Sequence, residues 1–230
     1  MTFDSPQSYD RLVEHWERHA TLEGDPLEDW LLTVLPAGRA SAVDLGCGTG
    51  RHAVLLADHF ERVVAADVSG PMIDLARQRR PRPNIDYLLA DALDVTGRFD
   101  FVFSSAMLHH VADLDAALRH IRSLVAPGGR AVLVDVTAPR RRAVRVAVSA
   151  APRLLYRTNA LVQLAVGVLL RRRDVRDSYR LHTFRPWLDH LATDRFLSAV
   201  EFDERYGSVF SGASFVAHRY FRSCVWDAPT

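Results

Sequence analysis

Three glycines at alternate positions form the most distinctive chemical pattern in this sequence. Gly46, Gly48 and Gly50 stand between an apolar segment, Ala42 to Leu45, and a segment of helical character that begins near Arg51. Glycine permits positive φ and lets the backbone approach a ligand closely, because no Cβ stands in the way. The first N–H groups of the following helix would point to the same place. The pattern predicts a ligand-binding turn, with a purely structural strand–helix turn as the alternative.

The spacing of these glycines argues against two common nucleotide-binding turns. A P-loop ends in Gly-Lys-Ser or Gly-Lys-Thr, whereas Arg51 and His52 follow the last glycine here. The dinucleotide fingerprint is Gly-x-Gly-x-x-Gly, whereas Gly50 comes one residue too early for that pattern. A nicotinamide-dependent oxidoreductase is therefore a disfavoured alternative. The turn is instead Gly-x-Gly-x-Gly, with Asp44 two residues before its first glycine.

Further acidic residues follow the glycine turn in a regular order. Asp67 ends the second predicted strand, and Asp91 with Ala92 follows the third. This order, together with Asp44 and the glycine turn, resembles the class I S-adenosylmethionine-dependent methyltransferases over roughly residues 41–136. Other segments that resemble the family are Phe99–Ser104, Met107–Val111 (Met-Leu-His-His-Val), Leu124–Arg130 and, more loosely, Ala217–Asp227.

The resemblance implies S-adenosyl-L-methionine as the cofactor and S-adenosyl-L-homocysteine as the product. In the family, the acid at the position of Asp67 accepts hydrogen bonds from both ribose hydroxyls. The Asp91 side chain and the Ala92 N–H would hold the adenine. As alternatives, Asp44 would only hold the glycine turn together, and Asp67 would cap the next helix. The implied cofactor-binding residues are Tyr9, Asp44, Gly46, Cys47, Gly48, Gly50, Asp67, Val68, Asp91, Ala92 and Ser104.

Two of these residues, and a tryptophan nearby, have competing structural interpretations. Tyr9 and Trp16 lie on a predicted N-terminal helix, which in this family often covers the cofactor. Tyr9 would face the sulfonium through a cation–π contact. Core packing is an equal alternative for Tyr9 and the favoured one for Trp16. Cys47 is interpreted as a small buried side chain rather than a nucleophile.

Methyl transfer from a sulfonium needs alignment of the acceptor and exclusion of water. A general base is needed only where the acceptor must lose a proton, as a hydroxyl must. His109 and His110 follow the fourth predicted strand, and either is a candidate base because histidine titrates near neutral pH. The alternative is that the pair only packs against the sheet. Asp135 ends the fifth strand and is a candidate for holding a polar substrate group.

The elements that must position these residues alternate in type. Strands without polar alternation, separated by helices, indicate a parallel sheet that is buried on both faces. Right-handed crossovers then give a doubly wound α/β fold. The resemblance implies a seven-stranded, mostly parallel Rossmann-like sheet. The predicted strands are residues 42–45, 62–66, 85–89, 99–104, 130–136, 199–206 and 216–226, and the helices between them are 51–60, 71–79 and 114–125.

We expect one methyltransferase domain over residues 1–230. Its parts are an N-terminal helical cap (1–38), a cofactor-binding core (41–137), a helical insertion after the fifth strand (138–185) and a C-terminal helix with strands (186–230). The insertion carries arginines at both ends and an apolar centre, Leu154 to Leu170. It would cover a substrate pocket, form a homodimer interface or rest on a membrane surface without inserting stably.

Composition excludes several classes of protein. The 230 residues include 48% hydrophobic and 25% charged residues, which excludes intrinsic disorder for most of the chain. The net charge of +1 and the scattered arginines disfavour nucleic-acid partners. Cys47 and Cys224 fit neither a disulfide framework nor a metal site. With no signal peptide or transmembrane segment predicted, we expect a metal-independent cytoplasmic protein.

The favoured interpretation is a methyltransferase that acts on a small, hydrophobic molecule. The sequence does not decide whether the methyl group goes to an O, N or C atom. The expected setting is secondary metabolism. One alternative keeps the cofactor and catalyses a non-methylating reaction such as cyclisation or elimination. Another is a non-enzyme that only binds the cofactor.

Overall fold

The computed structural model describes residues 10, 12–25, 27–138, 152–169, 175–191, 196–218 and 220–230. The chain divides into two compact units, one of Met1–Asp25 with Pro139–Arg195 and one of Pro26–Ala138 with Phe196–Thr230. We call them the helical unit and the sheet unit and describe each by itself. Every candidate site residue belongs to the sheet unit except Tyr9, which lies outside the described residues.

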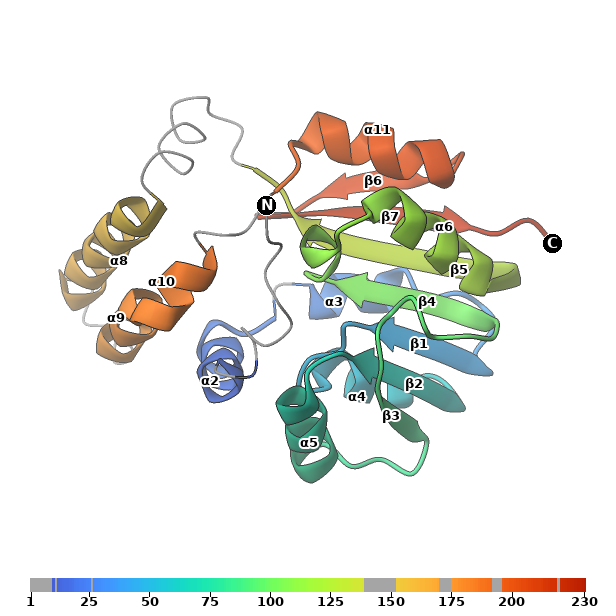
Figure 1. The fold of residues 1–230 in the computed structure, drawn as a ribbon, viewed down its shortest axis with the longest axis horizontal. Coiled ribbons are helices and arrows are strands. Elements are labelled where there is room, and N and C mark those ends of the chain that lie inside the picture. The colour runs from blue at the N-terminus through green and yellow to red at the C-terminus, as the bar shows by residue number, and fades with distance from the viewer. Residues whose placement is uncertain are drawn as a thin grey trace. The chain divides into compact units, whose positions relative to one another are not determined.

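The sheet unit contains a seven-stranded sheet in the order β3-β2-β1-β4-β5-β7-β6 (Figure 1). The first five strands of the chain pair in parallel, and β7 pairs antiparallel with both β5 and β6. This confirms the predicted seven-stranded, mostly parallel sheet. The strands are β1 Ser41–Leu45, β2 Arg62–Asp67, β3 Ile85–Leu89, β4 Phe99–Ser105, β5 Val125–Val136, β6 Ser214–Ala217 and β7 Phe221–Asp227.

The order of the strands decides where a ligand can bind. The chain runs outward from β1 through β2 to β3, and then crosses back to place β4 on the other side of β1. In open α/β sheets, ligands bind at the carboxyl ends of the strands where the order reverses in this way. The glycine turn follows β1 directly, so it lies at this point.

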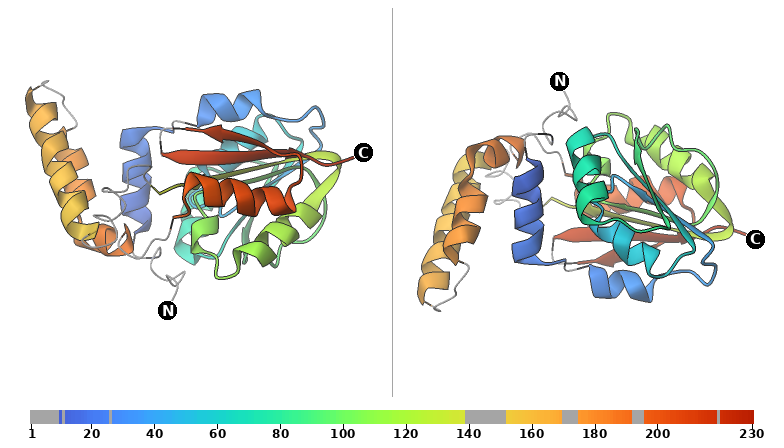
Figure 2. Two further views of the ribbon diagram at one scale, coloured as in Figure 1. Left: turned by 90° about the horizontal axis from the view of Figure 1, so that it is seen from above. Right: turned by 90° about the horizontal axis from the view of Figure 1, so that it is seen from below.

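Helices cover both faces of the sheet because the central strands carry apolar side chains on each face. One core cluster joins Leu118 of α6 and Phe202 of α11 to the sheet, and a second joins Leu31 of α3, Leu56 of α4 and Ile73 of α5 to its other face. Figure 2 shows α6 and α11 opposite α3 and α4. These helices are α3 Glu28–Thr33, α4 Arg51–Ala57, α5 Gly70–Arg79, α6 Leu114–Leu124 and α11 Ala199–Val209.

The segment after residue 198 differs from the prediction. Ala199–Tyr206 was predicted as a strand, but it lies within the helix α11. Phe202, Tyr206 and Val209 are buried at helical spacing, and a capping box at Ser198 fixes the start of the helix. The predicted final strand, Val216–Trp226, is in fact a hairpin of β6 and β7.

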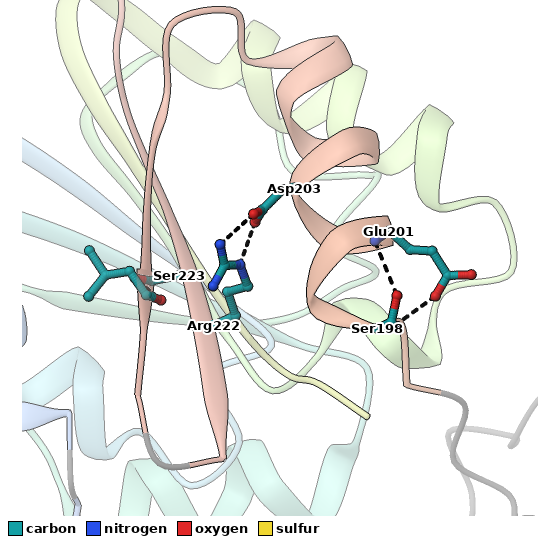
Figure 3. Close-up of polar contacts among 6 residues, drawn as sticks. Ser198, Glu201, Asp203, Arg222 and Ser223 are labelled. Carbon is teal, nitrogen blue, oxygen red and sulfur yellow. Dashed lines mark hydrogen bonds and ion pairs between the residues drawn. The ribbon is translucent and has the colours of Figure 1, made fainter. Parts of the chain in front are cut away.

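Two sets of polar contacts fix α11 (Figure 3). The Glu201 N–H donates to Ser198 Oγ at 3.2 Å, and the Ser198 N–H donates to Glu201 Oε2 at 2.8 Å. The guanidinium of Arg222, on β7, donates two hydrogen bonds to the carboxylate of Asp203. The helix is thus capped at its start and tied to the antiparallel edge of the sheet.

The helical unit consists of α2 Val13–Glu23, α8 Pro152–Leu169, α9 Val175–Thr183 and α10 Arg185–Leu191. The ring of Trp187, which is buried, lies 5.4 Å from that of His15 and 5.8 Å from that of Trp16. Trp16 is only partly buried, so its role in the core stays a prediction. Burial, with His19 and His182 nearby, lowers the pKa of His15 to about 4. None of the helices in the described ranges is long and apolar enough to cross a membrane.

The capping box gives a test of the α11 assignment. Ser198→Ala removes the side-chain acceptor for the Glu201 N–H, and we expect the free energy of unfolding to fall by about 1 kcal/mol. Ser208→Ala is the matched control, since this serine of the same helix only donates to the Arg205 carbonyl at 2.7 Å. Urea unfolding of both variants measures the difference. Equal stability of the two variants would contradict the helix start at Ser198.

Candidate active site

The turn after β1 adopts a conformation that requires its glycines. Gly46, Gly48 and Gly50 have φ values of 72°, 52° and 80°, in the left-handed region. A Cβ on Gly46 would lie 2.4 Å from Cγ of Met107, and one on Gly50 would lie 2.7 Å from the hydroxyl of Tyr87. The predicted tight turn is therefore present. The close contacts at Gly46 and Gly50 are with Met107 and Tyr87, so the approach of a ligand to this backbone stays a prediction.

Asp67 connects this turn to the next one along the sheet edge. Its Oδ2 accepts from the Gly48 N–H at 2.8 Å, and its Oδ1 accepts from the Ser69 N–H at 2.9 Å. Each carboxylate oxygen has two lone pairs and can accept more than one hydrogen bond. The alternative role as a helix cap is wrong, because Ser69 is the N-cap of α5.

Asp44 is a buried carboxyl beneath the glycine turn, with only 1% of its surface exposed. Its pKa is raised to about 6, chiefly by desolvation; His52 opposes the shift and the nearby Asp67 carboxylate adds to it. Within the described part of the chain, neither Oδ2 of Asp44 nor Oγ of Ser104 has a hydrogen-bond partner. Leu45 pairs with Ser104 across β1 and β4, so the two unsatisfied oxygens belong to neighbouring strand ends.

The other predicted cofactor residues lie on turns at the same edge of the sheet. Val68 follows β2 and is 42% exposed. Asp91 follows β3, where its Oδ1 accepts from the Leu93 N–H at 2.8 Å, and Ala92 packs partly against the core. Cys47 is buried, and desolvation raises the pKa of its thiol well above the ordinary value, which supports its interpretation as an inert side chain.

Two candidate residues that lie 26 positions apart in the sequence form a pair. Nδ1 of His109 lies 2.5 Å from Oδ1 of Asp135, and the two side chains are only 8% and 6% exposed. The same carboxylate oxygen also accepts from the Val136 N–H at 2.8 Å. The ring of His109 lies 3.9 Å from that of His110 and 5.1 Å from that of Phe196. The structure therefore gives Asp135 a partner within the protein.

Several residues that shape the site were not indicated by any pattern in the sequence. Ala106 has a φ of 53°, which is uncommon for a residue with a Cβ, and it begins the turn that carries Met107 against Gly46. Arg80 donates to the Thr49 carbonyl at 2.9 Å and so supports the glycine turn. Single residues of these types carry no recognisable spacing, so no pattern in the sequence indicated them.

The arrangement can hold a polar ligand along the ends of four adjacent strands. The glycine turn follows β1, Asp67 ends β2, Asp91 follows β3 and Ser104 lies near the end of β4. The unsatisfied oxygen of Asp44 fits a ligand that carries a hydrogen-bond donor or a positive charge. Among the residues the structure describes, no group of three or more His, Cys, Asp or Glu side chains is placed to hold a metal ion.

Comparison with known proteins agrees with this site. Residues 43–133 match the family described as a methyltransferase domain. An uncharacterized methyltransferase of Mycobacterium tuberculosis is 34% identical over 127 residues, which cover 54% of this chain and 63% of the relative. A 2-phytyl-1,4-naphtoquinone methyltransferase of Thermosynechococcus vestitus is 39% identical over 122 residues, covering 50% and 53%. The chain thus spans roughly half to two thirds of these relatives' lengths.

Solved structures share the fold. A putative methyltransferase in complex with the Trm112 methyltransferase activator of Haloferax volcanii has a TM-score of 0.64 at 17% identity, covering 96% of this chain and 98% of that one. A DhpI–SAH complex has a TM-score of 0.56 at 22% identity, covering 97% and 98%. Residues 43–133 thus match a methyltransferase domain, as the glycine turn and the acidic residues predicted, and the chain shares the fold of these solved methyltransferase structures.

The raised pKa of Asp44 gives a test of its burial. Because its pKa in the folded state is about 6 against an ordinary 3.8, the folded protein binds more protons than the unfolded chain between these values. We therefore compare the free energy of unfolding of the wild type with that of Asp44→Asn. The wild-type value minus the variant value should fall by at most about 3 kcal/mol as pH rises from about 4 to 6.

Urea unfolding at several pH values measures this difference. Asp86→Asn is the control, since Asp86 lies on β3 with an exposed side chain and forms an ion pair with Arg62 on β2. A stability difference that stays constant across the window would show that Asp44 is ionised and solvated in the folded protein.

Proposed function

We propose that this protein transfers a methyl group from S-adenosyl-L-methionine to a small molecule. The observation that carries the proposal is the glycine turn joined to Asp67, beside the unsatisfied Asp44 oxygen, at the switch point of the sheet. The family match over residues 43–133 supports the same conclusion. When bound, the cofactor supplies a methyl group on a sulfonium, which is already a good leaving group.

The chain's own residues would divide the binding between them. Asp67 would accept hydrogen bonds from the ribose hydroxyls while it keeps its bonds to Gly48 and Ser69. Asp91 and the Ala92 N–H would hold the adenine. The glycine turn, with Cys47 in it and Asp44 beneath it, would hold the amino-acid part, with Val68 and Ser104 bordering the site. Charge-assisted hydrogen bonds of this kind are short and strong.

The His109–Asp135 pair supports an acceptor that must lose a proton, such as a hydroxyl. If the Nδ1–H of His109 donates to Asp135, the other ring nitrogen is left as a proton acceptor. The carboxylate then stabilises the imidazolium that forms when His109 takes the proton. A base is useful only for such acceptors, because the cofactor needs no proton to leave. His110 and Phe196 pack against the ring and fix its position.

The acceptor is proposed to be small and hydrophobic. Phe196 beside His109 provides an apolar contact, and one relative is named as a 2-phytyl-1,4-naphtoquinone methyltransferase. The near-zero net charge of +1 argues against a nucleic-acid acceptor. We keep the cytoplasm as the proposed location, since Cys47 and Cys224 are both free thiols.

Cofactor binding tests the assignment of Asp67. Asp67→Ala should raise the dissociation constant for S-adenosyl-L-methionine about 5- to 150-fold, corresponding to roughly 1–3 kcal/mol for lost hydrogen bonds to a charged group. Isothermal titration calorimetry measures the constant. Asp86→Ala, which removes an exposed carboxylate of β3, should leave it unchanged. Wild-type protein that binds neither this cofactor nor its demethylated product would refute the proposed function.

Turnover tests the role of the His109–Asp135 pair. Protein incubated with methyl-labelled cofactor and an extract of its source should yield a labelled small molecule, identified by mass, and S-adenosyl-L-homocysteine. His109→Ala should then lower kcat about 10²- to 10⁴-fold while the cofactor's dissociation constant stays within about twofold.

His59→Ala is the control, since His59 lies beyond α4 on the solvent-exposed surface. Full turnover by His109→Ala would show that the acceptor needs no base. Cofactor binding without any labelled product would favour the non-methylating or non-enzymatic alternatives.

A further inference from the structure

The helix α8 turns large apolar side chains outward. Ala160 and Gly167 are its buried positions, and a Cβ on Gly167 would lie 2.2 Å from Cγ2 of Val175 on α9. The helix therefore packs against α9 through its small residues. Its exposed large apolar residues, from 48% to 81% exposed, are Leu154, Leu161, Val162, Val166, Val168 and Leu169.

These exposed residues fall within one arc of about 160° of the helix surface, which also contains the exposed Thr158 and Ala165. At 100° per residue, Leu154, Leu161 and Val168 lie within about 40° of one another, with Leu169 adjoining them on one side. Arg157 borders the same face on the other side and is exposed. Arg153 lies beyond it, in an ion pair with Asp189 at 2.6 Å. We call the surface formed by the six exposed apolar residues and Arg157 the α8 face.

The charge of the surrounding sequence is of a single sign. Residues 136–173 contain no aspartate or glutamate. Their nine arginines are Arg140, Arg141, Arg142, Arg145, Arg153, Arg157, Arg171, Arg172 and Arg173. The apolar run from residue 158 to residue 170 is thus preceded and followed by positive charge, in a chain whose net charge is only +1.

We propose that the α8 face binds an anionic lipid surface. A helix that buries apolar side chains at the boundary of headgroups and acyl chains, with arginines reaching the headgroups, has this composition. A second copy of the chain is a poorer occupant, because pairing two α8 faces would bring arginines together without any acidic partner from residues 136–173. No described helix is suited to crossing the membrane, so α8 would lie in the plane of the lipid surface. The proposal is independent of the methyltransferase assignment.

Co-sedimentation of the full chain with vesicles tests the proposal. The protein should sediment with vesicles of phosphatidylcholine containing about 30% phosphatidylglycerol, and at least tenfold more weakly with phosphatidylcholine alone. Binding should weaken as salt rises, because headgroup attraction is screened. Leu161→Glu with Val168→Glu should abolish binding, and Arg157→Gln should weaken it severalfold.

Two matched controls use exposed residues of the sheet unit. Val200→Glu changes an apolar residue of α11 that is 65% exposed, and Arg119→Gln changes an exposed arginine of α6. Both should bind like the wild type. Equal binding to neutral and anionic vesicles, or no binding to either, would overturn the proposal. Light scattering measures the oligomeric state of the wild type and of the Leu161→Glu, Val168→Glu variant. A wild-type dimer that dissociates in this variant would also overturn the proposal, because a second copy of the chain would then cover the α8 face.

Discussion

The close approach of the backbone after β1 is the constraint on which the candidate site depends. Met107 and Tyr87 stand where a Cβ on Gly46 or Gly50 would have to go. Only glycine satisfies both this crowding and the positive φ of the turn. The Gly48 N–H is thereby directed at Asp67, whose carboxylate also receives the N–H of Ser69. One side chain thus fixes two turns relative to each other at the edge where ligands bind.

Two buried carboxyl groups at this edge are satisfied in different ways. Asp135 has an imidazole and a backbone N–H as partners, so its burial is compensated within the protein. Asp44 keeps one oxygen without a hydrogen bond among the described residues, and its raised pKa reflects that cost. A paired carboxylate is suited to orienting a base, whereas an unsatisfied one is suited to receiving a donor from a ligand. The contrast supports separate roles for the two in acceptor and cofactor handling.

The apolar residues of the chain serve different purposes in its two units. In the sheet unit they fill the two faces of the sheet, as Phe202 and Tyr206 do from α11. In α8 the small residues face α9, while the large apolar residues are exposed. Burial of large residues is the dominant stabilising contribution to folding, so an outward apolar face indicates a binding partner. The positive charge around that face is the basis for choosing anionic lipid.

The sequence alone was sufficient for the order of strands and helices up to β5 and for the turns that carry the site. These features depend on local signals, namely the spacing of the glycines and the acids at the strand ends. It failed at Ala199–Tyr206, which was predicted as a strand, whereas the capping box at Ser198 begins a helix there. The pairing of His109 with Asp135, and the contact of Met107 with Gly46, join residues far apart in the chain. Only the parallel pairing of β4 with β5, and of β1 with β4, brings such residues together, because no local pattern records which strand ends become neighbours.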